Sequence, residues 1–222
     1  MAFQPQIIQS FTIGNLERNK KLILTTSKYS FFMLAIISAP IIYYCHAVLI
    51  IWLGDELPQY VERFVQFVLL CSIFDALAGP FWMSATAIGN IRSYNIVLTV
   101  INLATLPIAY LILKLGYGPV YAFSAKIFTY SLMQIFRYYF INKQLRFDNK
   151  EFQRYFFQIS AILIIIVGLA WFSNIEGKPT YLQLLTGTIT IELLLLSVMF
   201  VFGLQQYERV LMYNFLKKRF LN

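Results

Sequence analysis

Six long apolar runs, separated by short polar joints, constrain this chain more than any other feature of its sequence. Each run holds roughly 17 to 26 residues, and a helix of that length crosses the ~30 Å hydrocarbon layer of a membrane. Hydrophobic residues make up 59% of the 222 residues and charged residues only 13%, which excludes an ordinary water-soluble domain. The sequence therefore predicts an all-α fold, a polytopic bundle of six transmembrane helices.

The predicted spans account for most of the chain and fall into two groups. Four spans lie within residues 29–141 and two terminal spans lie within residues 156–203. Their predicted bounds are 29–52, 64–87, 94–113, 120–141, 156–172 and 181–203.

The segments outside the spans are polar and rich in basic residues. Residues 1–28 are expected to form a cytoplasmic amphipathic joint, and the apolar side chains expected to lie on its headgroup face are Ile7, Ile8, Phe11 and Leu16. Residues 142–155 are expected to form a cytoplasmic interfacial joint that binds anionic membrane lipid. Residues 204–222 form a basic cytoplasmic tail.

The distribution of the 18 basic residues predicts the orientation, because short basic loops stay on the cytoplasmic side. Three of them fall on one side of the predicted bundle, namely Arg63, Lys114 and Lys178. On the other side lie 14, namely Arg18, Lys20, Lys21, Lys28, Arg92, Arg137, Lys143, Arg146, Lys150, Arg154, Arg209, Lys217, Lys218 and Arg219, and the remaining one, Lys126, stands inside a predicted span. Both termini are therefore predicted to be cytoplasmic. Because this charge is spread over four separate joints, it does not indicate a nucleic-acid partner.

Three charged residues stand inside predicted spans, where a charge costs ~2.5 to 3.5 kcal/mol on insertion scales. They are Asp75, Lys126 and Glu192, at about 16, 9 and 16 Å below the outer ends of their helices. In one interpretation Asp75 and Lys126 form a buried ion pair that fixes helix packing. In the other, Lys126 attracts an anionic headgroup in a polar cavity, and Asp75 or Glu192 carries a coupling proton or cation.

Two arginines and four helix-breaking residues complete the candidate site. Arg92 and Arg137 lie nearer the cytoplasmic side, where a substrate would enter. The residues that predict kinks inside spans are Pro40, Gly79, Pro80 and Pro107. No metal site and no cofactor are expected, because the single histidine, His46, has no ligand at suitable spacing and no nucleotide or zinc motif occurs. Cys45 and Cys71 lie inside spans and are interpreted as packing residues.

A series of local motifs resembles the polysaccharide-transporter family of bacterial O-antigen and capsule flippases, within the multidrug/oligosaccharidyl-lipid/polysaccharide exporter superfamily. The order and spacing of these motifs carry the resemblance over most of the chain, and it is weakest beyond about Glu151. The motifs are PQIIQSFTIGNLERNKKLI, LIIWLGDELPQY, FDALAGP, AIGNIRSYNIV, LATLPIAYLILKLGY and IFRYYFINKQL.

The resemblance implies translocation of an undecaprenyl-pyrophosphate-linked oligosaccharide across the bacterial inner (plasma) membrane, for O-antigen, lipopolysaccharide or capsule biosynthesis. No covalent chemistry is implied, so the protein is not expected to be an enzyme. Members of the family have twelve to fourteen spans in two lobes, and alternating access uses both. This chain matches the C-terminal lobe in part. We therefore expect a truncated chain whose missing N-terminal lobe, or a partner subunit, completes the transporter.

Other functions remain open at this stage. A drug or metabolite exporter of the same superfamily would share the fold. A small integral-membrane transferase acting on lipid-linked sugars would need an acid or base at the outer face, and Asp55, Glu56 and His46 are the candidates there. A noncatalytic membrane scaffold would need none of these side chains.

Overall fold

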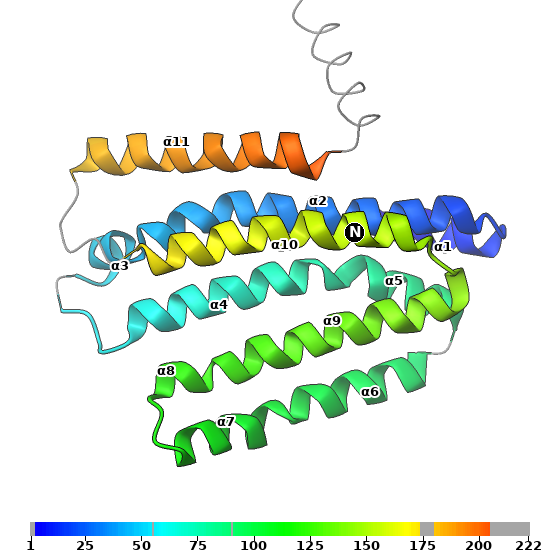
Figure 1. The fold of residues 1–222 in the computed structure, drawn as a ribbon, viewed down its shortest axis with the longest axis horizontal. Helices are drawn as coiled ribbons and strands as arrows, with labels where there is room; N and C mark the ends of the chain where they lie inside the picture. Colours follow the sequence, from blue (N-terminus) through cyan, green and yellow to red (C-terminus); the bar gives the residue numbers. More distant parts are fainter. Residues whose placement is uncertain (1–2, 55, 90, 174–179, 205–222) are drawn as a thin grey trace, which may run out of the picture.

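The structure is a computed structural model that describes residues 3–54, 56–89, 91–173 and 180–204. Within these ranges it consists of helices and connecting turns and contains no strand, so the all-α prediction is confirmed (Figure 1). The helices are α1 (Gln4–Thr12), α2 (Leu16–Tyr43), α3 (Cys45–Leu53), α4 (Val61–Ala76), α5 (Ala78–Ile88), α6 (Ile91–Leu103), α7 (Thr105–Lys114), α8 (Pro119–Ala122), α9 (Ser124–Leu145), α10 (Asn149–Trp171) and α11 (Tyr181–Val198). A π-helical turn, Met199–Gly203, continues α11.

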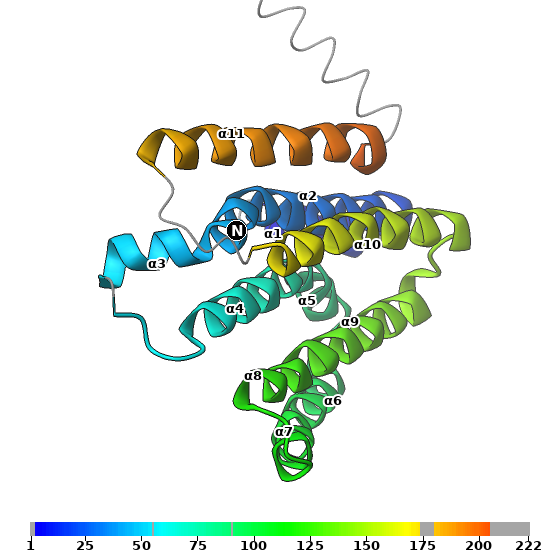
Figure 2. The same ribbon diagram turned by 60° about the vertical axis from the view of Figure 1, so that its left-hand side comes forward.

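The long helices lie side by side, with α2 near the middle (Figure 1). Helix α2 packs against α4, α5, α10 and α11, and α9 joins this group to α6 and α7. In both ribbon views α11 forms one margin of the molecule and α6 with α7 forms the other (Figure 2). The core therefore lies around α2, and the two margins are the least covered parts.

Five helical stretches are long and apolar enough to cross a membrane, and they make this a multi-pass membrane protein by composition. They are Leu16–Tyr43, Val61–Ile88, Ile91–Lys114, Lys150–Trp171 and Tyr181–Gly203. The remaining predicted span corresponds to α9, which has 22 residues but includes Lys126, Arg137 and Lys143. Its length suits a membrane helix, but it is not one of the five stretches that are apolar enough to cross a membrane.

Two of the spans are interrupted where proline predicts it. Proline cannot donate to the carbonyl four residues before it and clashes with that carbonyl. Four residues before Pro80 is Ala76, where α4 ends, and four residues before Pro107 is Leu103, where α6 ends. Pro40 lies inside α2, which ends at Tyr43.

The first 28 residues differ from the expected joint. Helix α2 begins at Leu16, because the Asn15 side chain caps it by accepting a hydrogen bond from the backbone N–H of Arg18 at 3.0 Å. Helix α1 packs against α5 and buries Ile7 completely, so Ile7 lies in the core and not on a headgroup surface. The segment is a helix, a turn and the beginning of the next helix.

The expected interfacial joint at 142–155 is also mostly helical. Helix α9 continues to Leu145 and α10 begins at Asn149, so only residues 146–148 connect them. The Asp148 side chain accepts from the backbone N–H of Lys150 at the start of α10. Most of the segment expected to be an interfacial joint therefore belongs to the ends of α9 and α10.

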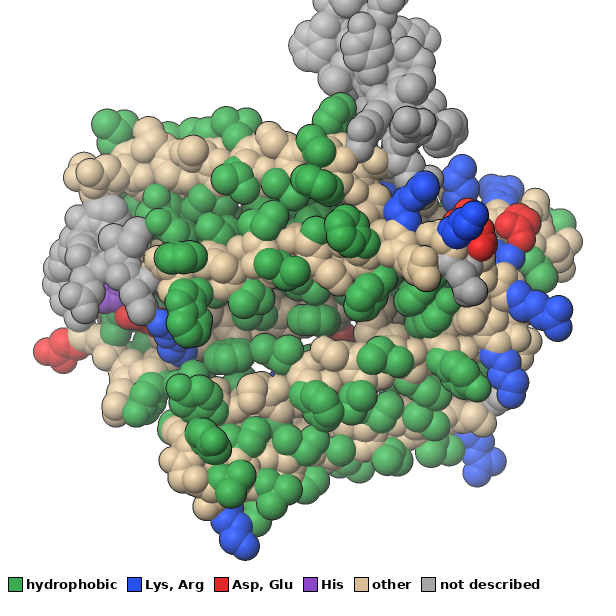
Figure 3. All heavy atoms as spheres, in the orientation of Figure 1, with side chains coloured by type: hydrophobic (Ala, Val, Ile, Leu, Met, Phe, Trp, Pro, Cys, Tyr) green, Lys and Arg blue, Asp and Glu red, His purple; other side chains and the backbone are tan. Residues whose placement is uncertain are grey.

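Basic side chains gather at one end of the bundle (Figure 3). This end holds α1, the start of α2 and α10, and the end of α9, whereas the opposite end holds α3 and the α7–α8 connection (Figure 1). The basic residues that the sequence concentrates in certain joints thus lie together at one end of the helices. We name these the basic end and the opposite end.

Candidate functional site

Two of the three intramembrane charges, Asp75 and Lys126, lie on α4 and α9, which pack against each other. At the opposite end this seam is filled by aromatic rings, because the Phe123 ring lies 4.9 Å from the Phe64 ring and 6.3 Å from the Phe67 ring, centre to centre. Further along α4, Cys71 and Asp75 continue the same face at helical spacing. The seam thus changes from aromatic to polar as it enters the bundle.

The polar part of the seam surrounds a hollow between α4 and α9. Figure 3 shows this hollow midway along the molecule, with an acidic side chain in its depth. On α9, the Lys126 ammonium lies 5.7 Å from the centre of the Tyr130 ring, a cation–π contact. Asp75 and Lys126 both act electrostatically on the Cys71 thiol. The two charges predicted from sequence therefore lie on neighbouring helices, within electrostatic reach of the same thiol.

The predicted ion pair between Asp75 and Lys126 does not form. Among the residues that the structure describes, no ion pair of either side chain is present, and Asp75 is exposed while Lys126 is half-buried. The Lys126 side chain turns along its own helix to the Tyr130 ring one turn away. A bound anion could therefore approach the ammonium group without displacing a carboxylate.

Glu192 does not join this site. It lies half-buried on α11, which packs against α2 at the margin opposite α6 and α7. Helices α2 and α10 stand between α11 and α9 (Figure 1). A direct role for Glu192 beside Lys126 is excluded within this chain.

Arg137 is nearly fully buried on α9, two turns nearer the basic end than Tyr130. Tyr94 of α6 is fully buried and lies close to the Arg137 guanidinium, and the rings of Phe136 and Phe140 pack against Tyr94. The Arg137 Nε and the Tyr94 hydroxyl have no hydrogen-bond partner among the described residues. Arg137 is thus enclosed in the packing of α6 and α9, whereas Arg92 is exposed near the start of α6.

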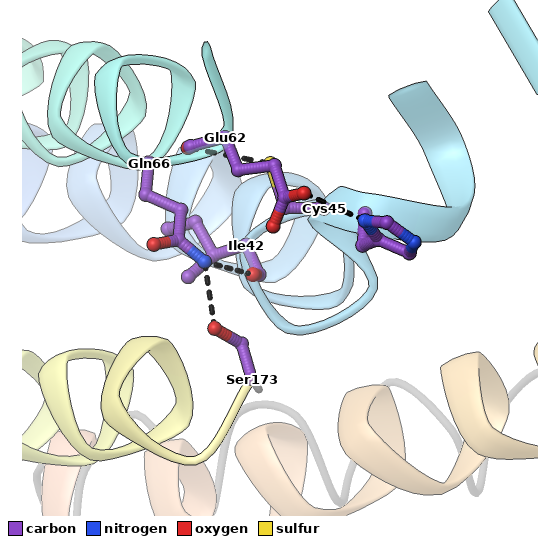
Figure 4. Close-up of polar contacts among 6 residues, drawn as sticks. Ile42, Cys45, Glu62, Gln66 and Ser173 are labelled. Carbon is purple, nitrogen blue, oxygen red and sulfur yellow. Dashed lines mark hydrogen bonds and ion pairs between the residues drawn. The ribbon is translucent and has the colours of Figure 1, made fainter. Parts of the chain in front are cut away.

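A second polar cluster at the opposite end was not predicted from the sequence (Figure 4). The buried Gln66 side chain donates to the carbonyl of Ile42 at 3.1 Å and to the Ser173 hydroxyl at 2.7 Å, which ties together α2, α4 and the end of α10. Four residues earlier, Glu62 lies 2.6 Å from His46. The spacing of Glu62 and Gln66 on one helix face was a usable signal, but Glu62 lies before the predicted span and Gln66 carries no charge, so a search for charges inside spans finds neither.

This cluster bears on the transferase alternative. His46 contacts Glu62, whereas Glu56 is exposed in the loop before α4, and Asp55 lies outside the described residues. The Cys45 thiol donates to the backbone carbonyl of Glu62 at 3.6 Å, a packing contact. Across the described ranges no three histidine, cysteine or acidic side chains converge as a metal site would require. These contacts hold the ends of the helices together, and they leave one carboxylate and one imidazole at the surface.

Comparison of the chain with family models, with curated proteins and with solved structures gives no match. What the chain itself establishes is its class: an all-α protein with five helical stretches suited to cross a membrane, and a charged hollow between α4 and α9.

Proposed function

We propose that the chain is part of a flippase that moves an undecaprenyl-pyrophosphate-linked oligosaccharide across the bacterial inner membrane, with both termini in the cytoplasm. The order of the sequence motifs supports this proposal, and the observation that carries it is the hollow between α4 and α9. Asp75 on α4 and Lys126 on α9 both act electrostatically on Cys71, and charges inside predicted spans are costly and tend to mark functional sites. Such a site suits the passage of a polar headgroup.

The physical task of such a protein is to shield a sugar and a pyrophosphate from hydrocarbon while the lipid tail stays in the bilayer. Lys126 would attract the pyrophosphate, and the Tyr130 ring beside it holds the ammonium group in place. Asp75, on the facing helix, is placed to exchange a proton or cation as the anion arrives or leaves. Because Arg137 is enclosed in packing, we assign it a structural role near the cytoplasmic entrance.

Alternating access between the two sides of a membrane needs two bodies that move against each other. Helices α4 and α9 already touch through Phe64 and Phe123 at the opposite end, so this chain supplies one wall of a pathway. We therefore propose that an N-terminal lobe or a partner subunit supplies the facing wall.

The test is the substitution Lys126→Ala in cells that depend on this chain for their surface polysaccharide. Loss of the polysaccharide at an unchanged level of membrane-inserted protein is expected, with part of the function retained in Lys126→Arg. Lys114→Ala serves as the matched control, since Lys114 is an exposed lysine at the end of α7. Normal polysaccharide in Lys126→Ala cells would refute the assignment of Lys126.

A further inference from the structure

A stripe of polar side chains runs along α6, inside the stretch Ile91–Lys114 that is long and apolar enough to cross a membrane. The stripe consists of four exposed residues, namely Arg92, Asn95, Thr99 and Asn102. Their spacing alternates between three and four residues, which places them on one face of the helix. One face of an otherwise apolar membrane helix is therefore polar over about 15 Å.

The stripe extends into the middle of the membrane. Asn102 stands at the midpoint of Ile91–Lys114, so a helix that crosses the ~30 Å hydrocarbon layer carries it near the centre of that layer. No water is present there to bond with a carboxamide, and leaving the group without a partner is costly. Polar side chains inside membrane helices accordingly form hydrogen bonds with a neighbouring helix or face a polar cavity.

The described part of the chain supplies no partner for the stripe. Among its hydrogen bonds, none involves the side chain of Asn95, Thr99 or Asn102. Thr105, at the start of α7, differs, because its hydroxyl lies 2.9 Å from the hydroxyl of Thr129 on α9. Thr105 is thus satisfied within the chain, whereas the stripe is exposed at the margin that α6 and α7 form (Figure 2).

The side chains of the stripe are complementary to themselves. An asparagine carboxamide both donates and accepts, so two asparagines that face each other across a two-fold axis can each donate to the other, and threonine hydroxyls can do the same. The alternating spacing of three and four residues is that of the contact positions between two parallel helices packed at a shallow angle. The stripe therefore matches a second copy of itself in chemistry and in spacing.

We propose that two copies of this chain pair in the membrane through the stripe on α6, about a two-fold axis along the membrane normal. Copies inserted by the same asymmetry of basic residues share one orientation, so their α6 helices run parallel and each residue of the stripe meets its own counterpart. The two copies of Asn102 then form the deepest contact. Arg92 lies in the first turn of α6 at the basic end, where its guanidinium reaches the headgroup layer and stays solvated.

The same face continues beyond the break between α6 and α7 at Ala104. Leu106 and Tyr110 follow the stripe at helical spacing and are 71% and 63% exposed, so large side chains are available to pack between the copies in the other half of the membrane. Val100 lies ~100° round the helix from Thr99 and faces lipid in this arrangement. The contact face and the lipid face of α6 are therefore distinct.

The first test measures self-association of the purified full chain in liposomes. Resonance energy transfer between copies labelled at the N-terminus with a donor or an acceptor gives the dissociation constant of the dimer. Asn102→Leu should raise this constant about tenfold, as for the loss of an interhelical asparagine pair, and Asn102→Gln should raise it less. Gln144→Leu is the matched control, because Gln144 is an exposed amide on α9 outside the stripe.

A second test locates the interface by cysteine cross-linking, and it decides the proposal if Asn102→Leu does not fold. Asn102→Cys should form disulfide-linked dimers on mild oxidation because its counterparts meet at the axis, whereas Val100→Cys should not. The native Cys45 and Cys71 are buried and do not compete.

Three results would overturn the proposal. They are a monomer at every ratio of chain to lipid, an unchanged dissociation constant in folded Asn102→Leu, and equal cross-linking at positions 100 and 102. Each would assign the stripe to a different membrane helix or to a polar cavity. Neither test uses transport of a polysaccharide, so the outcome is independent of the proposed function.

Discussion

Helix α2 and the α6–α7 stretch are both long and apolar enough to cross a membrane, but α2 lies near the middle of the bundle and α6–α7 lies at its margin. In α2, 56% of the most apolar window is buried inside the protein, whereas in α6–α7 the value is 6%. Yet α6–α7 is the more apolar of the two. In a bilayer the lipid tails are as apolar as leucine, so apolarity does not drive a helix into the core.

The residues of the two stretches explain the difference. The buried face of α2 carries small side chains, such as Ala35 and Ala39, which let neighbouring helices approach closely, together with large ones such as Phe31. The exposed face of α6–α7 carries large apolar side chains, among them Val100 and Leu106. Small residues therefore occur where helices pack closely, whereas large apolar residues occur both in the core and on the face that meets lipid or another membrane lobe.

The largest expected effect comes from placing a charge on the α6–α7 face. Val100 is exposed near the middle of that stretch, so Val100→Lys should cost ~2.5 to 3.5 kcal/mol of insertion free energy. Glycosylation mapping of membrane insertion measures the effect. Ser93→Lys, an exposed position near the basic end, is the control and should insert normally. Full insertion of Val100→Lys would mean that this face meets a polar cavity.

Overpacking α2 should produce the next largest effect. Ala35 is fully buried, so Ala35→Leu should destabilise the fold by about 1 to 3 kcal/mol, measured as a lower midpoint of thermal unfolding in detergent. Ile37 lies two residues away and is exposed, and Ile37→Phe should leave the midpoint unchanged. Equal effects at the two positions would remove the distinction between a core face and a lipid face.

The third largest effect is expected from removing a buried hydrogen bond in the core. Ser27→Ala leaves the Tyr155 hydroxyl without the partner that lies 2.7 Å away, and the expected cost is about 1 to 3 kcal/mol of unfolding free energy. Adding Tyr155→Phe removes the orphaned hydroxyl, so the double variant should be less destabilised than the sum of the two single variants. Simple additivity would contradict the coupling between α2 and α10.

The sequence predicted the lengths and order of the helices better than their contacts. The last span was expected at residues 181–203, and the structure has Tyr181–Gly203. The start of α2 was missed because residues 16–21 read as a polar joint, although Asn15 caps a helix there and Asn19 is buried against α1, where its amide donates to the carbonyl of Ile7 at 2.6 Å. A hydropathy profile depends only on how apolar each residue is, so it does not reveal such contacts.

The candidate site shows the same limit. Depth along a helix follows from residue counting, so the sequence predicts similar depths for Asp75, Lys126 and Glu192. Which helices are neighbours depends on packing that a single sequence does not encode in its periodicity. Asp75 and Lys126 therefore lie on the packed helices α4 and α9, whereas Glu192 lies across the bundle on α11.

The smallest expected change in stability concerns the opposite end of the bundle, where two neighbouring contacts can be compared. The His46–Glu62 pair is more than one third exposed on both sides, so Glu62→Gln should change the unfolding free energy by only about 0.2 to 1 kcal/mol. Gln66→Leu, one turn away on α4, removes two buried hydrogen bonds and leaves the Ser173 hydroxyl without one of its partners, which should cost more. Unfolding midpoints of the two variants, measured side by side, decide the order. A larger loss in Glu62→Gln than in Gln66→Leu would show that the surface pair, and not the buried amide, holds the ends of α2, α4 and α10 together.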